Sequence, residues 1–305
     1  MLTLAAALLL SPVSTPVQLA STPAPLHGTL LTPEGQTRAA AVIIAGSGPT
    51  DRDGNSPQFG IRASTYRLLA EGLAERGVAS VRIDKRGIGQ SAAAGPTEPD
   101  LRFSTYADDA RAWAAEAAAK TGQPCAWLIG HSEGALVALA AAAKGGDKVC
   151  GLVLLSGAGR PAGVVLREQL AALPEPLKTR AYEVLTELEA GRTVADPPAE
   201  LAALFRPSVQ PYLISWLTLD PARLAAAYDG PIFIGQGTTD LQVTVADAEA
   251  IKAAQPRATL AVWDGVNHVL KTAPADRAAN VATYMDPALP LAPGVVEAVA
   301  GFVLK

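Results

Sequence analysis

The chain has 305 residues, of which 49% are hydrophobic and 18% are charged, and its formal net charge is −4. This length suits one large α/β domain or two small ones, and the apolar fraction excludes global disorder. The small negative charge, without any run of lysine or arginine, gives no electrostatic basis for binding nucleic acid or an anionic membrane surface.

The N-terminal segment is set apart by its composition. Residues 2–10 are apolar except for Thr3, and a stretch rich in serine and proline follows. This run is too short to span a bilayer, but it fits the apolar region of a secretory signal, with Ala20 before a cleavage point. No lysine or arginine precedes it, so a disordered arm is the alternative. We therefore exclude residues 1–22 from the predicted fold and expect an exported protein, with the cytoplasm as the alternative.

From residue 23 onward, short apolar runs alternate with helical patterns. Strands are expected at residues 28–31 (at the sheet edge), 40–45, 79–83, 125–129, 149–155, 231–235 and 258–263. Helices are expected at residues 66–76, 106–120, 135–143, 245–254 and 294–303. Strands that alternate with helices predict a mostly parallel sheet with helices on both faces. Residues 23–157 and 228–305 would form this α/β core.

One motif in this alternation carries chemistry. Between the strand at 125–129 and the helix at 135–143 lies Gly130-His131-Ser132-Glu133-Gly134. A G-x-S-x-G in this context is a nucleophile elbow, a strained turn that lifts a serine hydroxyl above the carboxyl edge of a parallel sheet. Its glycines allow the close backbone approach that the turn needs. Ser132 is therefore the predicted nucleophile.

The alternation breaks in one long segment. Residues 158–227 contain no convincing strand, and proline-punctuated helices are expected there at 164–173, 177–190, 199–205 and 209–217. A structureless insertion of this size is unusual in a compact domain, so we predict a helical cap. Three aromatic side chains of this segment either line an apolar substrate pocket or form the cap's own core: Phe205, Tyr212 and Trp216.

A serine nucleophile needs a base that takes its proton. The chain has three histidines. His27 precedes the parallel strands, and the side chain of His131 should diverge from that of Ser132 on the turn. His268 follows the last strand, where a loop at the carboxyl edge of the sheet is expected. His268 is therefore the predicted base.

The base in turn needs a carboxylate that orients it. Asp240 is the preferred acid because it follows the strand at 231–235, so that serine, aspartate and histidine come in order across three successive loops. Asp264, just before the histidine loop, is the competitor.

The tetrahedral intermediate also needs backbone N–H donors for its oxyanion. One should be the amide of Glu133, directly after the predicted nucleophile. The other should come from the glycine-rich loop at residues 46–55, where we choose the amide of Ser47. This loop lacks the Lys-Ser/Thr pair of a P-loop and the G-x-G-x-x-G spacing of a dinucleotide site, which disfavours a nucleotide.

Four segments together resemble the α/β-hydrolase superfamily. They are residues 46–55, 84–91, 130–134 and 267–271. The resemblance is closest to bacterial carboxylesterases grouped with the serine aminopeptidase-like and prolyl-oligopeptidase-like hydrolases. It extends from about residue 28 to the end and is least specific in the cap.

The resemblance implies an α/β-hydrolase fold and no cofactor. It implies Ser132, Asp240 and His268 as a catalytic triad, with the amides of Ser47 and Glu133 as oxyanion donors. The familiar histidine before the oxyanion glycine is Ala45 in this chain.

The segment at residues 84–91 matches a loop that is mainly structural in the family. Within it, Arg86 is expected to bond the turn of Asp51 and Asp53.

Cys125 and Cys150 lie near the starts of neighbouring predicted strands, where a disulfide is sterically feasible if their Cβ vectors agree. Export favours the bond, whereas two buried thiols would be expected in the cytosol. Two cysteines and three scattered histidines give no zinc spacing, so no metal is expected.

The sequence therefore predicts a serine hydrolase that cleaves short- or medium-chain or aryl carboxylic esters through an acyl-enzyme on Ser132. A peptidase or amidase of the serine aminopeptidase type is the alternative, although no acidic cluster marks a site for a free amino terminus. A non-catalytic binding protein on the same scaffold is disfavoured by the ordered serine, aspartate and histidine. The expected partner is a small ester, without nucleic acid or a membrane span, and the oligomeric state stays open.

Overall fold

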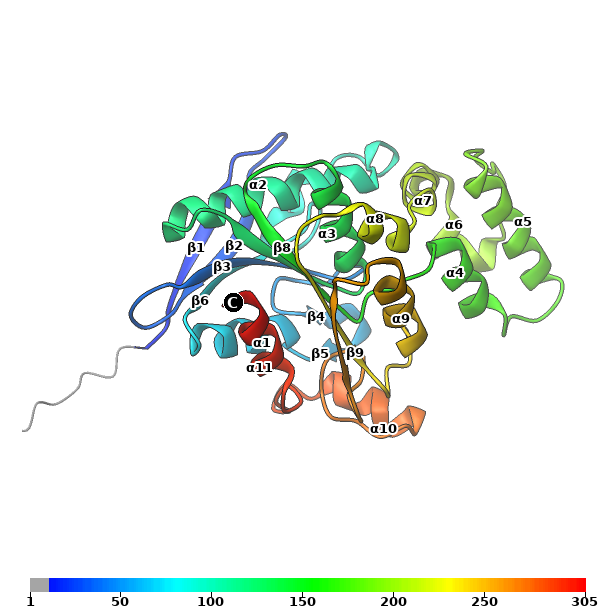
Figure 1. Ribbon diagram of the computed structural model, residues 1–305. Helices are drawn as coiled ribbons and strands as arrows, with labels where there is room; N and C mark the ends of the chain where they lie inside the picture. The colour runs from blue at the N-terminus through cyan, green and yellow to red at the C-terminus, as the bar shows by residue number, and fades with distance from the viewer. Residues whose placement is uncertain (1–10) are drawn as a thin grey trace, which may run out of the picture.

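The computed structural model describes residues 11–305 (Figure 1). Within them, an eight-stranded sheet has the strand order β1-β2-β6-β3-β7-β8-β9-β10. The strands are β1 (Val13–Leu19), β2 (Leu26–Thr32), β3 (Ala39–Ile44), β6 (Val78–Ile83), β7 (Ala126–His131), β8 (Val149–Leu155), β9 (Ile232–Gly237) and β10 (Thr259–Trp263). Pairing is parallel from β6 to β10 and antiparallel only at β1 and β2. The predicted mostly parallel sheet is thus confirmed.

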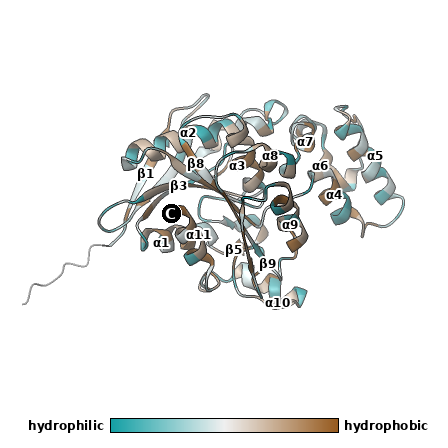
Figure 2. Ribbon diagram, viewed as in Figure 1, coloured by the Kyte–Doolittle hydropathy of each residue, from teal (hydrophilic) through white to brown (hydrophobic). Residues whose placement is uncertain are grey.

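Helices cover both faces of this sheet. The helices of the core are α1 (Thr65–Ala74), α2 (Phe103–Thr121), α3 (Glu133–Ala143), α8 (Pro221–Ala227), α9 (Val245–Ala254), α10 (Arg277–Ala282) and α11 (Val295–Val303). Side chains of α2, α3 and α9 pack on one face, and those of α1 and α11 pack on the other. In β3, Val42 and Ile44 face the first layer while Ile43 faces the second, so the strand is apolar on both sides. Figure 2 shows this hydrophobic strand in brown between helices of mixed colour.

The N-terminal boundary of the predicted fold is wrong. Val13–Leu19 form β1, which pairs with β2 along its whole length and makes β1, not residues 28–31, the edge of the sheet. Only Val17 of this strand is buried, so the segment carries little apolar pattern that a sequence reading could detect. The apolar run at residues 2–10 lies outside the described residues. Cleavage after Ala20 would remove β1 from the sheet.

The insertion after β8 is helical, as predicted. Its helices are α4 (Ala162–Leu170), α5 (Leu177–Glu189), α6 (Ala202–Phe205) and α7 (Gln210–Leu217), which gather at one end of the molecule (Figure 1). We call residues 162–217 the cap. The predicted cap at residues 158–227 is too long, because its last helix, α8, packs on α3 and α9 of the core. None of the helices in residues 11–305 is both long and apolar enough to cross a membrane.

A disulfide joins the amino ends of two central strands. Cys125 precedes β7 and Cys150 is the second residue of β8, with their Cα atoms 5.3 Å apart. The bond is therefore at the opposite end of β7 from Ser132. A two-stranded hairpin of β4 (Asn55–Ser56) and β5 (Ile61–Arg62) lies outside the main sheet and was not anticipated from the sequence.

Candidate active site

Ser132 sits on a strained turn between β7 and α3. Its φ of 55° and ψ of −121° place it in a region that L-residues rarely adopt. A Cβ on Gly130 would lie 2.1 Å from the carbonyl oxygen of Gly134, and one on Gly134 would lie 2.4 Å from that of Ile44. Both glycines are therefore required by backbone contact, which is the local reason for the G-x-S-x-G pattern.

His268 and Asp240 are hydrogen-bonded to each other. The His268 Nδ1 lies 2.8 Å from Asp240 Oδ2, and the Asp240 side chain is fully buried. Since a carboxylate only accepts, Nδ1 carries the proton and Nε2 is left as an acceptor. Asp264 is exposed and accepts instead from the Thr238 hydroxyl, so the structure pairs His268 with Asp240 and not with its competitor.

Further donors fix the Asp240 carboxylate. Its Oδ1 accepts from the backbone N–H groups of Gln242 at 2.8 Å and Val243 at 3.0 Å, and its Oδ2 also accepts from Gln236 Nε2 at 3.1 Å. Burial by itself raises the pKa of Asp240, but the His268 ring and the two backbone donors lower it, and the net pKa is below the ordinary value. The carboxylate is therefore ionised at neutral pH.

Ser132 and His268 border one cavity. They line a hollow of about 260 Å³ together with residues 46–50 of the predicted oxyanion loop and the β4–β5 hairpin. Within the described part of the chain, no hydrogen bond links the Ser132 hydroxyl to the His268 ring. Such bonds are often long in a ligand-free site and tighten only when substrate is bound.

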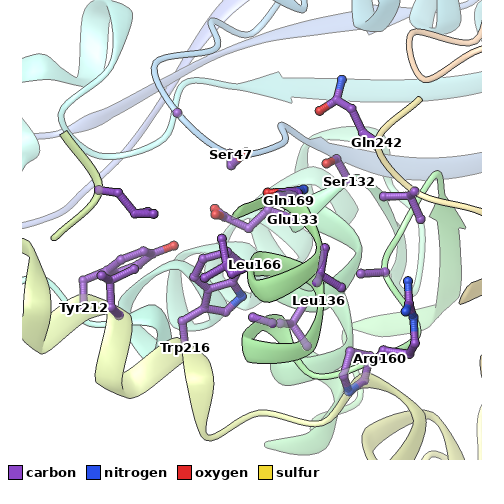
Figure 3. Close-up of a pocket in the computed structure, with 18 of the residues that line it drawn as sticks. Ser47, Ser132, Glu133, Leu136, Arg160, Leu166, Gln169, Tyr212, Trp216 and Gln242 are labelled. Carbon is purple, nitrogen blue, oxygen red and sulfur yellow. The ribbon is translucent and has the colours of Figure 1, made fainter. Parts of the chain in front are cut away.

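A second cavity of about 380 Å³ lies between Ser132 and the cap. Figure 3 shows Tyr212 and Trp216 projecting from α7 toward Glu133 and Leu136, which belong to α3. Four residues line both cavities, so the two hollows meet at the serine: Ser47, Gly48, Ser132 and Gln242. The sequence did not predict Gln242 as a cavity residue, although it lies only two residues beyond Asp240.

The predicted substrate contact of Phe205 is wrong. Its side chain is 0% exposed and does not line the cavity, because it is enclosed in the cap's own apolar core. Tyr212 and Trp216, by contrast, do line the cavity beneath the cap. They are on α7, whereas Phe205 ends the short helix α6 before it.

The predicted oxyanion loop lies directly against the elbow. A Cβ on Gly46 would be 3.1 Å from the Ser132 Cβ, so the two backbones are in close contact. Ser47, the next residue, is exposed to both cavities beside Ser132. Glu133 is the first residue of α3, where backbone N–H groups have no partner within the helix. Both predicted donors therefore border the space above the serine.

A buried polar chain missed by the sequence reading connects this loop to His268. The Gly46 N–H donates to Tyr66 Oη at 2.9 Å, and Tyr66 Oη lies 2.9 Å from His131 Nδ1. His131 Nε2 in turn lies 2.7 Å from the backbone carbonyl of His268. Because a carbonyl only accepts, Nε2 of His131 carries the proton and Nδ1 accepts from the tyrosine.

His131 is therefore neutral as well as buried. Burial, followed by the nearby His268, lowers its pKa to about 3. The His131 ring is hydrogen-bonded to Tyr66 and to the His268 carbonyl, so it supports the backbone of the predicted base.

The expected role of Arg86 is wrong. It does not bond the turn of Asp51 and Asp53, but binds Asp109 of α2 through Nε at 2.6 Å and Nη2 at 2.8 Å. Burial raises the pKa of Asp109, and the arginine opposes this as its charge partner. Asp53 is paired instead with the buried Arg82.

Comparisons with known proteins agree with this architecture. The family described as serine aminopeptidase, S33, matches residues 59–274, well over half of the chain. No curated protein matches the chain significantly.

Among solved structures, Est1E from Butyrivibrio proteoclasticus, with ferulic acid bound, is 18% identical with a TM-score of 0.61, covering 95% of this chain and 100% of its own. A lipase-esterase related protein from Clostridium acetobutylicum is 18% identical with a TM-score of 0.55, covering 91% of this chain and 99% of its own. A proline iminopeptidase from Mycobacterium smegmatis is 14% identical with a TM-score of 0.54, covering 84% and 92%. These likenesses support the fold, and the family match identifies the chain as a member of the serine aminopeptidase, S33, family of α/β-hydrolases.

Proposed function

We propose that the protein is a serine esterase that hydrolyses carboxylic esters through an acyl-enzyme on Ser132. The observation that carries this proposal is the pairing of His268 Nδ1 with the buried Asp240. This pairing leaves Nε2 of the ring as a proton acceptor on the cavity that Ser132 also borders.

The chemistry follows from these positions. Ser132 Oγ attacks the ester carbonyl carbon while His268 Nε2 takes the hydroxyl proton, and Asp240 stabilises the resulting imidazolium. The carbonyl oxygen becomes an oxyanion that accepts from the amides of Ser47 and Glu133. Collapse breaks the bond to the alcohol oxygen, and His268 returns its proton to the leaving alcohol. A water molecule then attacks the acyl-enzyme in the same way and releases the acid.

The two cavities suggest where each part of the ester binds. His268 must reach the leaving oxygen to protonate it, and this residue lines the smaller cavity but not the one beneath the cap. The alcohol therefore belongs in the smaller cavity. The acyl group belongs beneath the cap, where Leu136, Leu166 and Trp216 offer apolar surface.

Esters fit the cavity beneath the cap better than peptides with a free amino terminus. Its lining includes one carboxylate, that of Glu133, and this group is paired with Lys85. The lining also includes Arg160, which is paired with Asp247 and Glu168. A substrate ammonium would have to compete with Lys85 for its partner. Peptidase or amidase activity is therefore the second candidate.

The disulfide supports export as the accompanying proposal. Such bonds persist mainly in oxidising compartments. Fractionation of the source cells tests this: recovery of the protein in the cytoplasm with both thiols reduced would contradict it.

The decisive experiment compares the protein with its Ser132→Ala variant. The wild type should hydrolyse p-nitrophenyl butyrate and react with a fluorophosphonate probe at Ser132. The variant should lose at least about 10⁴-fold in kcat and all labelling, while its melting temperature stays within a few degrees. Full esterase activity in the variant would refute the assignment of Ser132 as the nucleophile. Turnover of aminoacyl anilides without any turnover of esters would refute the proposed esterase activity in favour of peptidase activity.

A further inference from the structure

Lys85 is a buried lysine whose ammonium binds the oxyanion loop. It follows β6 by two residues and is only 6% exposed. Its Nζ donates to the carbonyl oxygen of Gly46 at 2.5 Å. A hydrogen bond from a charged donor is roughly twice as strong as a neutral one, so this contact is a firm constraint on the carbonyl.

The carbonyl of Gly46 and the amide of Ser47 belong to the same peptide unit. In a planar trans peptide, the C=O and the N–H point in opposite directions. A donor that holds the oxygen of Gly46 therefore also sets the direction of the Ser47 N–H. Withdrawal of electron density by the ammonium makes that N–H a stronger donor, because hydrogen bonds in series polarise one another.

The rest of Gly46 is held as well. Its N–H donates to Tyr66 Oη at 2.9 Å, and a Cβ on it would lie 3.1 Å from the Ser132 Cβ. The peptide that follows can then rotate only if the lysine contact is broken. Lys85 is thus a side chain that directly holds the Gly46–Ser47 peptide in its orientation.

Lys85 is itself fixed by the other half of the predicted oxyanion hole. Its Nζ lies 3.4 Å from Glu133 Oε1, and the two side chains are 5% and 7% exposed. It also lies 5.4 Å from the centre of the Tyr106 ring, which favours a cation. Glu133 supplies the second predicted amide, so one ammonium contacts both the peptide unit that carries the first predicted donor and the residue that carries the second.

We propose that Lys85 is a positioning residue that orients and polarises the Gly46–Ser47 peptide as an oxyanion donor. This role rests on the proposed function, since it assumes an oxyanion formed on attack by Ser132. It acts on the transition state and not on the bound ester, which carries no full charge on its carbonyl oxygen.

The test is Lys85→Met, measured with p-nitrophenyl butyrate and with an alkyl trifluoromethyl ketone, which forms a tetrahedral oxyanion on the serine. Loss of a complete oxyanion donor lowers kcat by about 10²- to 10³-fold, so loss of its alignment should lower kcat by about 10- to 100-fold. KM should change less than about threefold, and the inhibition constant of the ketone should rise in parallel with the loss in kcat. Lys144→Met is the matched control, because it removes a lysine from the exposed pair with Asp108 and should leave kcat unchanged.

A double variant separates alignment from the effect of an orphaned charge. Lys85→Met leaves Glu133 buried without its partner, and Glu133→Gln removes that charge while keeping the backbone amide. If kcat stays low in Lys85→Met/Glu133→Gln, the missing contact to Gly46 is responsible. Recovery of kcat in the double variant would overturn the proposal.

Failure of this proposal differs from failure of the proposed function. A wild type that neither hydrolyses esters nor labels at Ser132 refutes the function. An active wild type whose folded Lys85→Met variant keeps its kcat and ketone affinity refutes only the role of Lys85. If the methionine variant does not fold, Lys85→Gln replaces it. The neutral amide should still lose about tenfold in kcat, and an unchanged kcat would count against the proposal.

Discussion

The loops around the serine and the cap above them are held together by different interactions. We call residues 45–55, 131–134, 238–244 and 264–271 the active-site edge. There, buried polar groups bind one another directly, as in the contacts of Asp240 with His268 and of His131 with the His268 carbonyl. The cap combines an apolar interior with half-exposed ion pairs, such as Arg167 with Glu189.

This difference separates two tasks. Buried hydrogen bonds lose much of their energy when geometry changes, so the active-site edge has few alternative arrangements. Apolar packing tolerates changes of shape, and exposed ion pairs contribute only about 0–1 kcal/mol. We therefore expect the edge to determine the chemistry and the cap to determine which acyl groups are accepted.

The largest effect should come from Asp240→Asn. The amide would favour the wrong tautomer of His268 and could not stabilise its charged form, which lowers kcat by about 10⁴-fold in a serine triad. The relative rates on acetyl and octanoyl esters should stay the same, because the cap is untouched. Steady-state kinetics on both esters checks this. A changed preference for acyl chain length would show that the active-site edge also determines which acyl groups are accepted.

A smaller effect concerns the loss of folding stability in acid, which we attribute to His131 in the active-site edge. Its pKa is about 3 in the folded protein, against 6.5 for an ordinary histidine, so between these values the unfolded chain binds a proton that the folded chain does not. Stability therefore falls as the pH drops below 6.5, by about 2 kcal/mol at pH 5.

Urea unfolding at pH 7 and pH 5 tests this assignment. His131→Asn should lack this part of the pH dependence, whatever its stability at pH 7. Arg167→Met, which removes a half-exposed ion pair of the cap, should keep this pH dependence. A His131→Asn variant that loses stability between pH 7 and pH 5 as steeply as the wild type would contradict the assignment.

The smallest effect should come from Trp216→Ala in the cap. Loss of its contact with a bound chain should lower kcat/KM on p-nitrophenyl octanoate by about tenfold, or about 1.4 kcal/mol. The value on p-nitrophenyl acetate should change less than about twofold, since an acetyl group is too short to reach the cap. Equal losses on both esters would show that Trp216 affects the chemistry, like the active-site edge, and not the choice of acyl group.

The strands, the elbow and the order of the site residues could be predicted because each leaves a local pattern. The strand at Val149–Leu155 and the helix at Val245–Ala254 have the expected bounds, since continuous apolar runs and capping residues mark them. The pairing of His268 with Asp240 agrees with an order read from loops alone. The strand β1 could not be predicted, because an edge strand with one buried residue has no apolar pattern in the sequence.

Contacts between polar residues that are distant in the sequence could not be predicted either. Nothing in the sequence near Lys85 or Tyr66 says that both bind Gly46, which lies 39 and 20 positions away. Arg86 was assigned the wrong partner for the same reason, since its charge is visible in the sequence but the approach of α2 is not. Phe205 and Trp216 are both aromatic cap residues, and only the packing of their helices distinguishes a core residue from a cavity wall.

Both cysteines of the chain are used in the disulfide between Cys125 and Cys150, far from the serine along β7. The oxidised protein therefore has no thiol of its own to react with maleimides or iodoacetamides. A single cysteine introduced on the outer surface of α5 would be the sole attachment point for a fluorophore or spin label. Movement of the helices over the serine during turnover could then be followed by spectroscopy without first removing native residues.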